Sequence, residues 1–361
     1  MTLNKMMELP PYGVEQREKD SMLLFRMNEL TAFHRKNCQE YGRMLRNLEY
    51  TKEADSLEAI PMLPVQMFKK KTLSSVPEQH IYKTMTSSGT TGQQVSKIFL
   101  DKETASNQQK VLARIVSEFT GSSRMPMIIL DCPSVIKDRA MFSARGAGIL
   151  GFSIFGIKRI FALDDDMRLN VAGLKEFLET HKGKTVLLFG FTFMIWQYVY
   201  KELARLEIPL DLSNAVLIHG GGWKKLEAQK VSRDVFKQKL RGVCGIKEEN
   251  IHDYYGMVEQ TGCIYMECEC GHLHASTYSE ILIRNMRDFS LCRPMERGVI
   301  QVLSTLPESY PGHSVLTEDE GMILGIDDCP CGRKGTYFEV FGRIKNAEVR
   351  GCSDTFEEAR H

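Results

Sequence analysis

The chain has 361 residues, of which 43% are hydrophobic and 26% are charged, and its formal net charge is +1. This composition is typical of a globular protein that is long enough to bury a large core in two or more structural units. The balanced charge provides no long-range field for nucleic acid or an anionic membrane, so it favours small-molecule or protein partners.

The N-terminal residues lack the apolar run of a secretion signal, which argues against export. The longest uncharged apolar run, Thr185 to Tyr200, is shorter than the roughly 20 residues of a membrane span, and we interpret it as a buried strand that continues into a helix. The sequence contains ten cysteines. Without an export signal they favour reduced thiols, metal ligands or catalysis over disulfides, and they predict a cytoplasmic protein.

Residues 1–80 are predicted to form a helical N-terminal segment that packs on a larger domain. Between residues 12 and about 58, apolar side chains fall near helical spacing. They are Leu23, Leu24, Met27, Leu30 and Phe33. Two prolines, Pro61 and Pro64, then prevent a regular helix and indicate an extended crossing.

Residues 84–92 form a run of hydroxyl side chains and glycines, Thr-Met-Thr-Ser-Ser-Gly-Thr-Thr-Gly. Backbone N–H groups beside glycines, together with hydroxyl groups, can surround an anion without a formal charge. The run contains neither a P-loop lysine nor the G-x-G-x-x-G pattern of dinucleotide-binding folds. Two interpretations remain at this point, a phosphate-binding loop of another kind and a polar linker.

From Met125 onward, apolar runs alternate with helical patterns, which predicts βα units and a mostly parallel sheet. The runs are Met125–Leu130, Arg159–Leu163, Thr185–Gly190 and Ala215–His219. Gly220 to Gly222 follow the last run at the carboxyl end of a predicted strand, where backbone can approach a ligand, although a plain turn would also explain them. We assign residues 81–341 to this α/β core, with a smaller β-rich part from about residue 275.

Three further motifs carry groups suited to nucleotide chemistry. Tyr254-Tyr-Gly-Met-Val-Glu-Gln-Thr-Gly262 contains Glu259, a hard carboxylate of the kind that Mg²⁺ prefers, and Tyr255, a flat face for a base. Asp319, in Thr317-Glu-Asp319, is a candidate for binding ribose hydroxyls. Arg343, in Phe341-Gly-Arg-Ile-Lys345, offers a guanidinium for phosphate or ribose.

The order of these motifs resembles the adenylate-forming superfamily over essentially residues 60–352. Within it, the chain looks most like the LuxE-type acyl-protein synthetases, with phenylacetate-CoA ligases next. Three segments carry the likeness: Ile60-Pro-Met-Leu-Pro-Val-Gln-Met-Phe-Lys69, Ser87-Ser-Gly-Thr-Thr-Gly92, and Gly342-Arg-Ile-Lys-Asn-Ala-Glu-Val-Arg-Gly-Cys-Ser-Asp-Thr355. The resemblance implies the α/β fold of the large domain of adenylate-forming enzymes, with mostly parallel sheets flanked by helices and a small β-rich subdomain.

The resemblance also implies a site for ATP and Mg²⁺. The phosphate binders would be Ser87, Ser88, Gly89, Thr90, Thr91 and Gly92. The adenine would be surrounded by Gly221, Gly222, Tyr254, Tyr255 and Gly256. Glu259 would bind Mg²⁺, Asp319 would hold the ribose, and Arg343 would be the arginine beside the hinge. In many members Pro-Lys-Gly continues the loop, whereas here the lysine, Lys97, comes slightly later.

Residues 342–361 would be a hinge remnant, because the chain ends about ten residues after the hinge motif where relatives carry a mobile domain. LuxE-type enzymes are acylated on a cysteine near the C-terminus, which here would be Cys352, and Arg350 would favour its thiolate. Cys352, Glu259 and Arg343 then form the expected catalytic set. An inert exposed thiol is the alternative for Cys352.

The function implied is ATP-dependent activation of a long-chain fatty acid to an acyl-adenylate, followed by transfer to Cys352 and delivery to an acyl reductase. An acyl- or aryl-CoA ligase and a non-catalytic nucleotide-binding scaffold subunit are the alternatives. An acyl pocket lined by residues such as Phe189, Phe191, Phe193 and Trp196 would limit the chain length. His219 and His252 are conceivable general bases, but a hydrogen-bonded structural role is the more usual one for a lone histidine at a strand end.

Two short stretches, residues 266–274 and 328–333, together hold four cysteines and two histidines. Tetrahedral zinc takes four such ligands from loops that fold together. By resemblance to phenylacetate-CoA ligases, the ligands would be Cys268, His274, Cys329 and Cys331, with Cys270 and His272 as spares. Four protein ligands leave no open position, so this zinc would be structural. The alternative is a group of reduced side chains under a loop.

Overall fold

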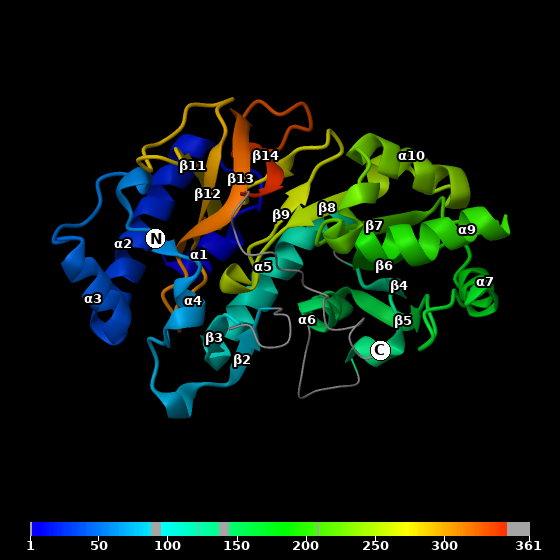
Figure 1. The fold of residues 1–361 in the computed structure, drawn as a ribbon, viewed down its shortest axis with the longest axis horizontal. Helices are drawn as coiled ribbons and strands as arrows, with labels where there is room; N and C mark the ends of the chain where they lie inside the picture. The colour runs from blue at the N-terminus through cyan, green and yellow to red at the C-terminus, as the bar shows by residue number, and fades with distance from the viewer. Residues whose placement is uncertain (1, 88–94, 122, 137–143, 208, 345–361) are drawn as a thin grey trace. The chain divides into compact units, whose positions relative to one another are not determined.

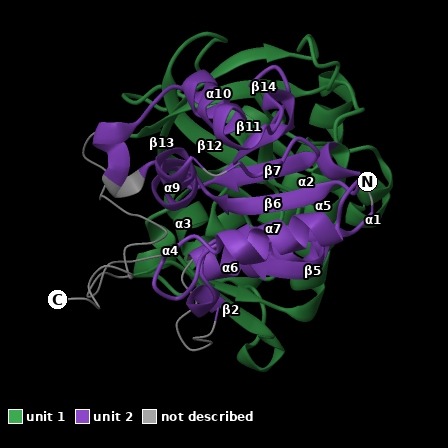
Figure 2. Ribbon diagram, turned by 90° about the vertical axis from the view of Figure 1, so that its right-hand side faces the viewer, with its two compact units in different colours: residues 1–118, 255–266, 272–350 green, residues 119–254, 267–271, 351–361 purple. Residues whose placement is uncertain are grey.

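The computed structural model describes residues 2–87, 95–121, 123–136, 144–207 and 209–344. They form two compact units, each made of separate stretches of chain (Figure 2). Unit 1 contains the described residues of 1–118, 255–266 and 272–350, and unit 2 contains those of 119–254 and 267–271. The N-terminal helices and the β-rich segment thus belong to the same unit. The three-part division at residues 80 and 341 stays a prediction.

Unit 1 begins with helices, as the periodicity of residues 12–58 predicts. Its helices are α1 (Leu3–Glu8), α2 (Gln16–Asn37), α3 (Gln39–Asn47), α4 (Met67–Lys70) and most of α5 (Lys102–Thr120), with short 3₁₀ turns at Leu57–Ala59, Glu78–His80 and Val258–Gln260 (Figure 1). In α2, Leu23, Met27 and Leu30 are buried as predicted, whereas Phe33 is 43% exposed. His34 takes the buried position instead, because it continues the three-and-four spacing of that face.

The sheet of unit 1 is mainly antiparallel. Its strands run in the spatial order β11 (Ser279–Arg284), β12 (Gly298–Ser304), β13 (Ser314–Ile326), β14 (Thr336–Arg343), β10 (Leu273–His274) and β9 (Tyr265–Glu267), and β1 (Leu63–Pro64) pairs parallel to β13. A separate hairpin joins β2 (Lys83–Thr86) to β3 (Lys97–Leu100). Helix α3 and the apolar faces of these strands share one core. Strands β11 to β14 make the chain from Ser279 onward rich in β-structure, and the boundary at about residue 275 stays a prediction.

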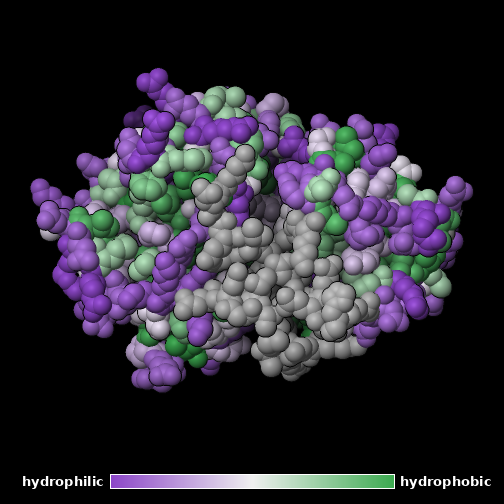
Figure 3. Space-filling view, in the orientation of Figure 1, coloured by the Kyte–Doolittle hydropathy of each residue, from purple (hydrophilic) through white to green (hydrophobic). Residues whose placement is uncertain are grey.

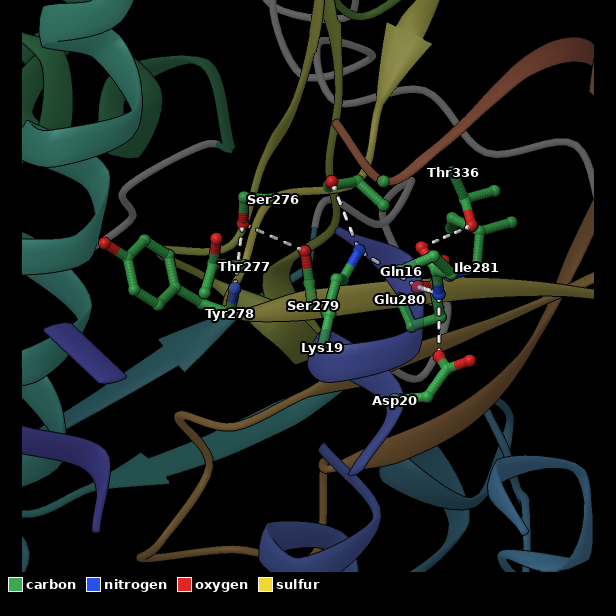
Figure 4. Close-up of polar contacts among 12 residues, drawn as sticks. Gln16, Lys19, Asp20, Ser276, Thr277, Tyr278, Ser279, Glu280, Ile281 and Thr336 are labelled. Carbon is green, nitrogen blue, oxygen red and sulfur yellow. Dashed lines mark hydrogen bonds and ion pairs between the residues drawn. The ribbon is translucent and has the colours of Figure 1, made fainter. Parts of the chain in front are cut away.

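A buried ion pair attaches α2 to this sheet. Lys19 Nζ lies 2.9 Å from Glu280 Oε2, and both side chains are 1% exposed (Figure 4). Gln16 Nε2 donates to the same carboxylate at 2.6 Å, and Lys19 Nζ also donates to Ala275 O at 3.3 Å. A buried charge is costly unless it is paired in one geometry, so these contacts define how α2 packs on β11.

Unit 2 contains the parallel sheet that the alternating pattern predicts. The strands run in the spatial order β8 (Ile251–Tyr255), β7 (Ala215–Gly220), β6 (Val186–Phe191), β4 (Met125–Leu130) and β5 (Gly156–Phe161). The helices are α6 (Ala144–Phe152), α7 (Val171–Thr180), α8 (Thr192–Met194), α9 (Lys201–Leu206) and α10 (Arg233–Cys244), with a π-helical turn at Ile195–Tyr200 and 3₁₀ turns at Pro133–Ile136, Ser153–Phe155, Lys224–Gln229 and Glu248–Asn250. The run Thr185 to Tyr200 is indeed a strand followed by a helix.

Helices cover both faces of this parallel sheet. Every residue of β4, β6 and β7 is buried, as expected for strands with helices on either side. Because side chains alternate along a strand, Ile128, Leu188 and Leu217 pack with α7, α9 and α10 in one core. On the other face, Phe189 stacks on Phe152 of α6 with ring centroids 4.1 Å apart.

The ends of α10 show how local sequence determines a helix boundary. The Ser232 side chain accepts a hydrogen bond from Val235 N at the start, and Gly245 has a φ of 72° just beyond the end, with its N–H bonded to Arg241 O. Among the described helices, none is both long enough and apolar enough to cross a membrane. The face drawn in Figure 3 is correspondingly a mixture of hydrophilic and scattered hydrophobic side chains.

Candidate functional site

Three of the predicted nucleotide-binding residues meet in unit 1. Tyr255, at the end of β8, donates a hydrogen bond of 2.7 Å from its hydroxyl to Asp319 Oδ2. Asp319 pairs in register with Arg343 on the neighbouring strand β14. This register places a carboxylate, a guanidinium and an aromatic ring together at one position of the sheet. Gly256, the next residue after Tyr255, is exposed.

The charges of this group depend on one another. Burial raises the pKa of Asp319, while the Tyr255 hydrogen bond and the Arg343 guanidinium lower it. Burial, followed by the Asp319 carboxylate, raises the pKa of Tyr255 well above its usual value, so its hydroxyl keeps the proton that it donates. The group therefore offers a carboxylate acceptor and a cation, which suits ribose hydroxyls and phosphate.

Glu259 lies nearby in the same unit, in the turn Val258–Gln260 that follows the tyrosine motif. It is only 5% exposed. Burial raises the pKa of its carboxyl group; a hydrogen bond with Ser96 and the charge of Arg343 act in the opposite direction, and Asp319 adds to the rise. A buried carboxylate with a hydroxyl and an arginine near it fits Mg²⁺, which binds through one or two carboxylates together with water and phosphate oxygens.

The hydroxyl run begins at a closed hairpin. Ser87 N donates to Ser96 O at 3.1 Å, and Ser96 N donates to Ser87 Oγ at 2.9 Å. Ser96, which sequence reasoning did not single out, is fully buried at the base of this loop and lowers the pKa of the Glu259 carboxyl group. Lys97 is exposed and pairs with Thr86. The predicted phosphate binders Ser88, Gly89, Thr90, Thr91 and Gly92 lie outside the described residues, as does Cys352.

Unit 2 holds the remaining predicted adenine-binding residues at the carboxyl ends of its strands. Gly221 and Gly222 have φ values of 83° and 65°, and both are exposed. A Cβ atom on Gly221 would lie 2.7 Å from Phe191 Cδ1, so the turn needs glycine there. Tyr254 packs against Phe152 at 5.4 Å between ring centroids. Strand ends of a parallel sheet are the usual place for a ligand in such folds.

The aromatic residues expected to line an acyl pocket lie in two places within unit 2. Phe189 and Phe191 contact each other edge to face at 5.9 Å, and Phe189 stacks on Tyr254 at 6.4 Å. Trp196 instead belongs to the core, where it contacts Trp223 at 5.1 Å. Phe189 and Phe191 thus share a cluster with a predicted adenine-binding residue, and Trp196 does not.

A group of charged residues around Glu267, next to the strand that carries Tyr254, was not predicted from the sequence. Glu267 Oε1 lies 2.9 Å from Lys237 Nζ and 3.3 Å from Arg233 Nε, and Glu267 Oε2 accepts Asp253 N at 2.9 Å. Partial burial and the Glu267 carboxylate raise the pKa of Asp253. In the sequence, only the position of Asp253 directly before the tyrosine pair pointed to this group.

The contacts of His219 and His252 are those of structural residues. His219 is buried and hydrogen-bonds to Thr192 Oγ1 at 3.0 Å, and burial lowers its pKa to about 3. His252 Nδ1 is 2.9 Å from Glu267 O. A histidine with so low a pKa is a poor general base, which favours the structural interpretation over the catalytic one.

The predicted metal ligands come together. The ligand atoms of Cys268, His274, Cys329 and Cys331 all lie within 4.8 Å of one another. Cys331 Sγ is 3.5 Å from His274 Nε2. Of the predicted spares, His272 Nδ1 is 3.3 Å from Cys329 Sγ, and Cys270 is exposed. Three thiols and one imidazole within this distance are a donor set that tetrahedral zinc accepts.

Comparison with known proteins adds a family. The family model described as "Acyl-protein synthetase, LuxE" matches residues 5–360. The chain is 22% identical over 340 residues to a long-chain-fatty-acid–luciferin-component ligase of Vibrio harveyi, covering 91% of this chain and 85% of that protein. It is 24% identical over 351 residues to the ligase of the same name of Aliivibrio fischeri, covering 94% and 88%.

The fold is also similar to that of solved enzymes. A 2-hydroxyisobutyryl-CoA ligase, crystallised in an open conformation with 2-HIB-AMP and CoA, has a TM-score of 0.69 and 15% identity, covering 93% of this chain and 77% of that chain. The same enzyme in its thioesterification state has a TM-score of 0.69 and 16% identity, covering 93% and 70%. At these identities the likeness shows the fold alone, and it confirms the predicted fold of adenylate-forming enzymes.

Proposed function

Because the chain belongs to the LuxE acyl-protein synthetase family, we propose that it activates a long-chain fatty acid with ATP and then transfers the acyl group to its own Cys352. Both curated relatives are named as ligases of long-chain fatty acids, which supports the substrate class. The observation that carries the proposal is the grouping of Tyr255, Asp319, Arg343 and Glu259 in unit 1.

Each of these residues has a role in the first step. The Asp319 carboxylate accepts the ribose hydroxyls, and Tyr255 orients it through the 2.7 Å hydrogen bond. Arg343 balances the phosphate charge. Glu259 is the residue that would hold Mg²⁺. When bound, this ion would neutralise charge on the phosphate oxygens. Ser87, Ser88, Gly89, Thr90, Thr91 and Gly92 would enclose the departing pyrophosphate.

The proposed reaction has two steps. A fatty-acid carboxylate oxygen attacks the α-phosphorus of ATP and the bond to the β-phosphate oxygen breaks, which gives acyl-AMP and pyrophosphate. The Cys352 thiolate then attacks the acyl carbonyl carbon, and AMP leaves with the electrons of the broken C–O bond. No general base is needed for the first step, because a carboxylic acid is already ionised at neutral pH.

We also propose that Cys268, His274, Cys329 and Cys331 hold a structural zinc ion. Four protein ligands leave no position for substrate, so the site would stabilise the fold and take no part in the acyl transfer.

The acyl group on Cys352 would pass to an acyl reductase. A thioester cycle needs a reduced thiol, which agrees with the cytoplasmic location predicted from the sequence. None of the described cysteines forms a disulfide.

The test is the intact mass of the full chain after incubation with Mg-ATP and tetradecanoic acid, beside a Cys352→Ala variant. We expect one acyl adduct that hydroxylamine removes and that the variant lacks. Cys270→Ala is the matched control, because Cys270 is an exposed thiol with no role in the proposed reaction. Pyrophosphate release without an adduct would move the acyl group to CoA or another acceptor. No pyrophosphate release would leave only a nucleotide-binding scaffold.

A further inference from the structure

Tyr310 contacts the backbone of Glu259 from a distant part of the chain. It lies in the connection between β12 and β13 and is fully buried. Its hydroxyl donates a hydrogen bond of 2.9 Å to Glu259 O. Gln108 Nε2 of α5 donates to the same hydroxyl at 3.4 Å, and Phe68 packs edge to face on the ring at 6.2 Å. The hydroxyl hydrogen is therefore directed at the Glu259 carbonyl.

Two further contacts hold the same turn, one against β12 and one against this connection. Gln260 Nε2 donates to Val302 O at 3.0 Å and to Gly312 O at 2.9 Å. A Cβ atom on Gly312 would lie 2.8 Å from Glu259 O and 2.3 Å from Tyr310 Cε2. Only glycine lets the connection approach the turn this closely. Tyr310, Gly312 and Gln260 therefore hold the peptide group that follows Glu259.

We propose that Tyr310 is a positioning residue for the Glu259 carboxylate, holding the turn Val258–Gln260 so that this carboxylate meets the metal–nucleotide complex in one place. The inference rests on the proposed function, in which Glu259 is the Mg²⁺ ligand. Its physical basis is that a glutamate side chain starts from its own peptide. If that peptide rotates, the carboxylate moves with it, and a hard ion with strict geometry loses a ligand.

Simple core packing predicts something different. A buried tyrosine needs only some partner for its hydroxyl, and removing that hydroxyl would then lower stability and nothing else. Tyr278 provides a matched comparison within the same unit. It is fully buried, and its hydroxyl donates to a carbonyl, Leu9 O, at 3.0 Å. That carbonyl belongs to the N-terminal segment and not to the candidate site.

The experiment compares Tyr310→Phe with Tyr278→Phe in the full chain by calorimetric titration of ATP, without fatty acid, in Mg²⁺ and in EDTA. We expect Tyr310→Phe to weaken ATP binding in Mg²⁺ by about two- to tenfold, the effect of one buried hydrogen bond, and to leave binding in EDTA unchanged. Tyr278→Phe should match the wild type in both. Gln108→Met, which keeps Tyr310 but removes its donor, should weaken the binding in Mg²⁺ by a smaller factor.

The outcomes separate this inference from the proposed function. If wild type shows a Mg²⁺-dependent gain in ATP affinity and Tyr310→Phe keeps all of it, Tyr310 only packs the core and the inference is wrong. Equal losses in Tyr310→Phe and Tyr278→Phe would also overturn it, since they would report lower stability. If wild type binds no ATP, the proposed nucleotide site itself fails. If it binds ATP equally with and without Mg²⁺, the Mg²⁺ role proposed for Glu259 fails. In both cases the inference fails as well.

Discussion

The Tyr255 hydroxyl is hydrogen-bonded to Asp319 Oδ2 at 2.7 Å, although 64 residues separate the two along the chain. One residue belongs to the motif that contains Glu259, and the other belongs to the strand that pairs with Arg343. This hydrogen bond therefore connects the parts of the candidate nucleotide site within unit 1.

Removing the Tyr255 hydroxyl should change the pH dependence of ATP binding. The hydrogen bond lowers the pKa of Asp319, so Tyr255→Phe raises it above its already elevated value. The ionised carboxylate that accepts ribose hydroxyls is then lost at a higher pH as the solution is acidified. We expect the acidic limb of ATP affinity, measured by calorimetry, to move to higher pH.

At a pH above the acidic limb of both proteins, the affinity should still fall by about two- to tenfold. Tyr265→Phe is the control, because its ring lies 5.9 Å from that of Tyr255 while its hydroxyl donates to Glu280 O. An unshifted acidic limb in Tyr255→Phe would contradict the role given to this hydrogen bond.

Glu259→Gln should lose activity and gain stability. The amide keeps the shape but removes the charge that would bind Mg²⁺, so ATP–pyrophosphate exchange should fall by about a hundredfold or more. Burial raises the pKa of Glu259 in the folded state, so its ionisation at neutral pH opposes folding. The melting temperature of Glu259→Gln should therefore rise at pH 7 to 8, and the gain should vanish near pH 4.

The exposed Glu339 on β14 supplies the matched control, since Glu339→Gln should change neither quantity. A lower melting temperature for Glu259→Gln would mean that the charged carboxylate stabilises the fold, which contradicts the expectation that its ionisation opposes folding.

The thiol and imidazole cluster should bind one zinc ion per chain. Cys329→Ser replaces a thiolate by a weak ligand, so bound zinc measured by mass spectrometry should fall well below one equivalent. Loss of a structural ion should also lower the melting temperature by several degrees, and a chelator should have the same effect on wild type. Cys270→Ser should keep the full metal content, because Cys270 is exposed and is not among the four clustered ligands. Full zinc occupancy in Cys329→Ser would remove Cys329 from the ligand set.

Acid should destabilise the protein through a buried histidine pair. The rings of His34 and His313 stack at 5.1 Å, and burial lowers the pKa of His34 to about 3. Burial also lowers the pKa of His313. Below about pH 6.5 the two histidines bind protons in the unfolded chain but not in the folded protein. The free energy of unfolding therefore falls as the pH is lowered from 6.5 toward 3.

Each such histidine contributes about 1.4 kcal/mol of unfolding free energy per pH unit in that range. His34→Asn should reduce the slope of stability against pH by about this amount, measured by urea unfolding between pH 6 and 4.5. His80→Asn, at an exposed position, should leave the slope unchanged. An unaltered slope in His34→Asn would show that His34 is protonated in the folded state.

Much of the fold could be read from local patterns. The helical spacing in residues 12–58 predicted α2 and α3, and the four apolar runs predicted the parallel strands β4 to β7. The motifs with Glu259, Asp319 and Arg343 were recognisable because their residue types and their order along the chain can be read from the sequence without knowing which residues are in contact. The cluster of cysteines and histidine was expected from the resemblance to phenylacetate-CoA ligases, and the structure brings these four side chains together.

Only the tertiary structure decided which of these groups meet. The contact of Tyr255 with Asp319 depends on strand register, and a one-residue slip in β13 would turn Asp319 to the opposite face. Periodicity did not distinguish Phe33 from His34 as the buried residue, because neighbouring helix positions differ by only 100° of rotation and the partner surface selects between them. Tyr310 carried no sequence signal, since its partner is a backbone carbonyl 51 residues away and every residue has such a carbonyl. Sequence determined the elements and the chemistry they carry, while long-range packing determined which side chains act together.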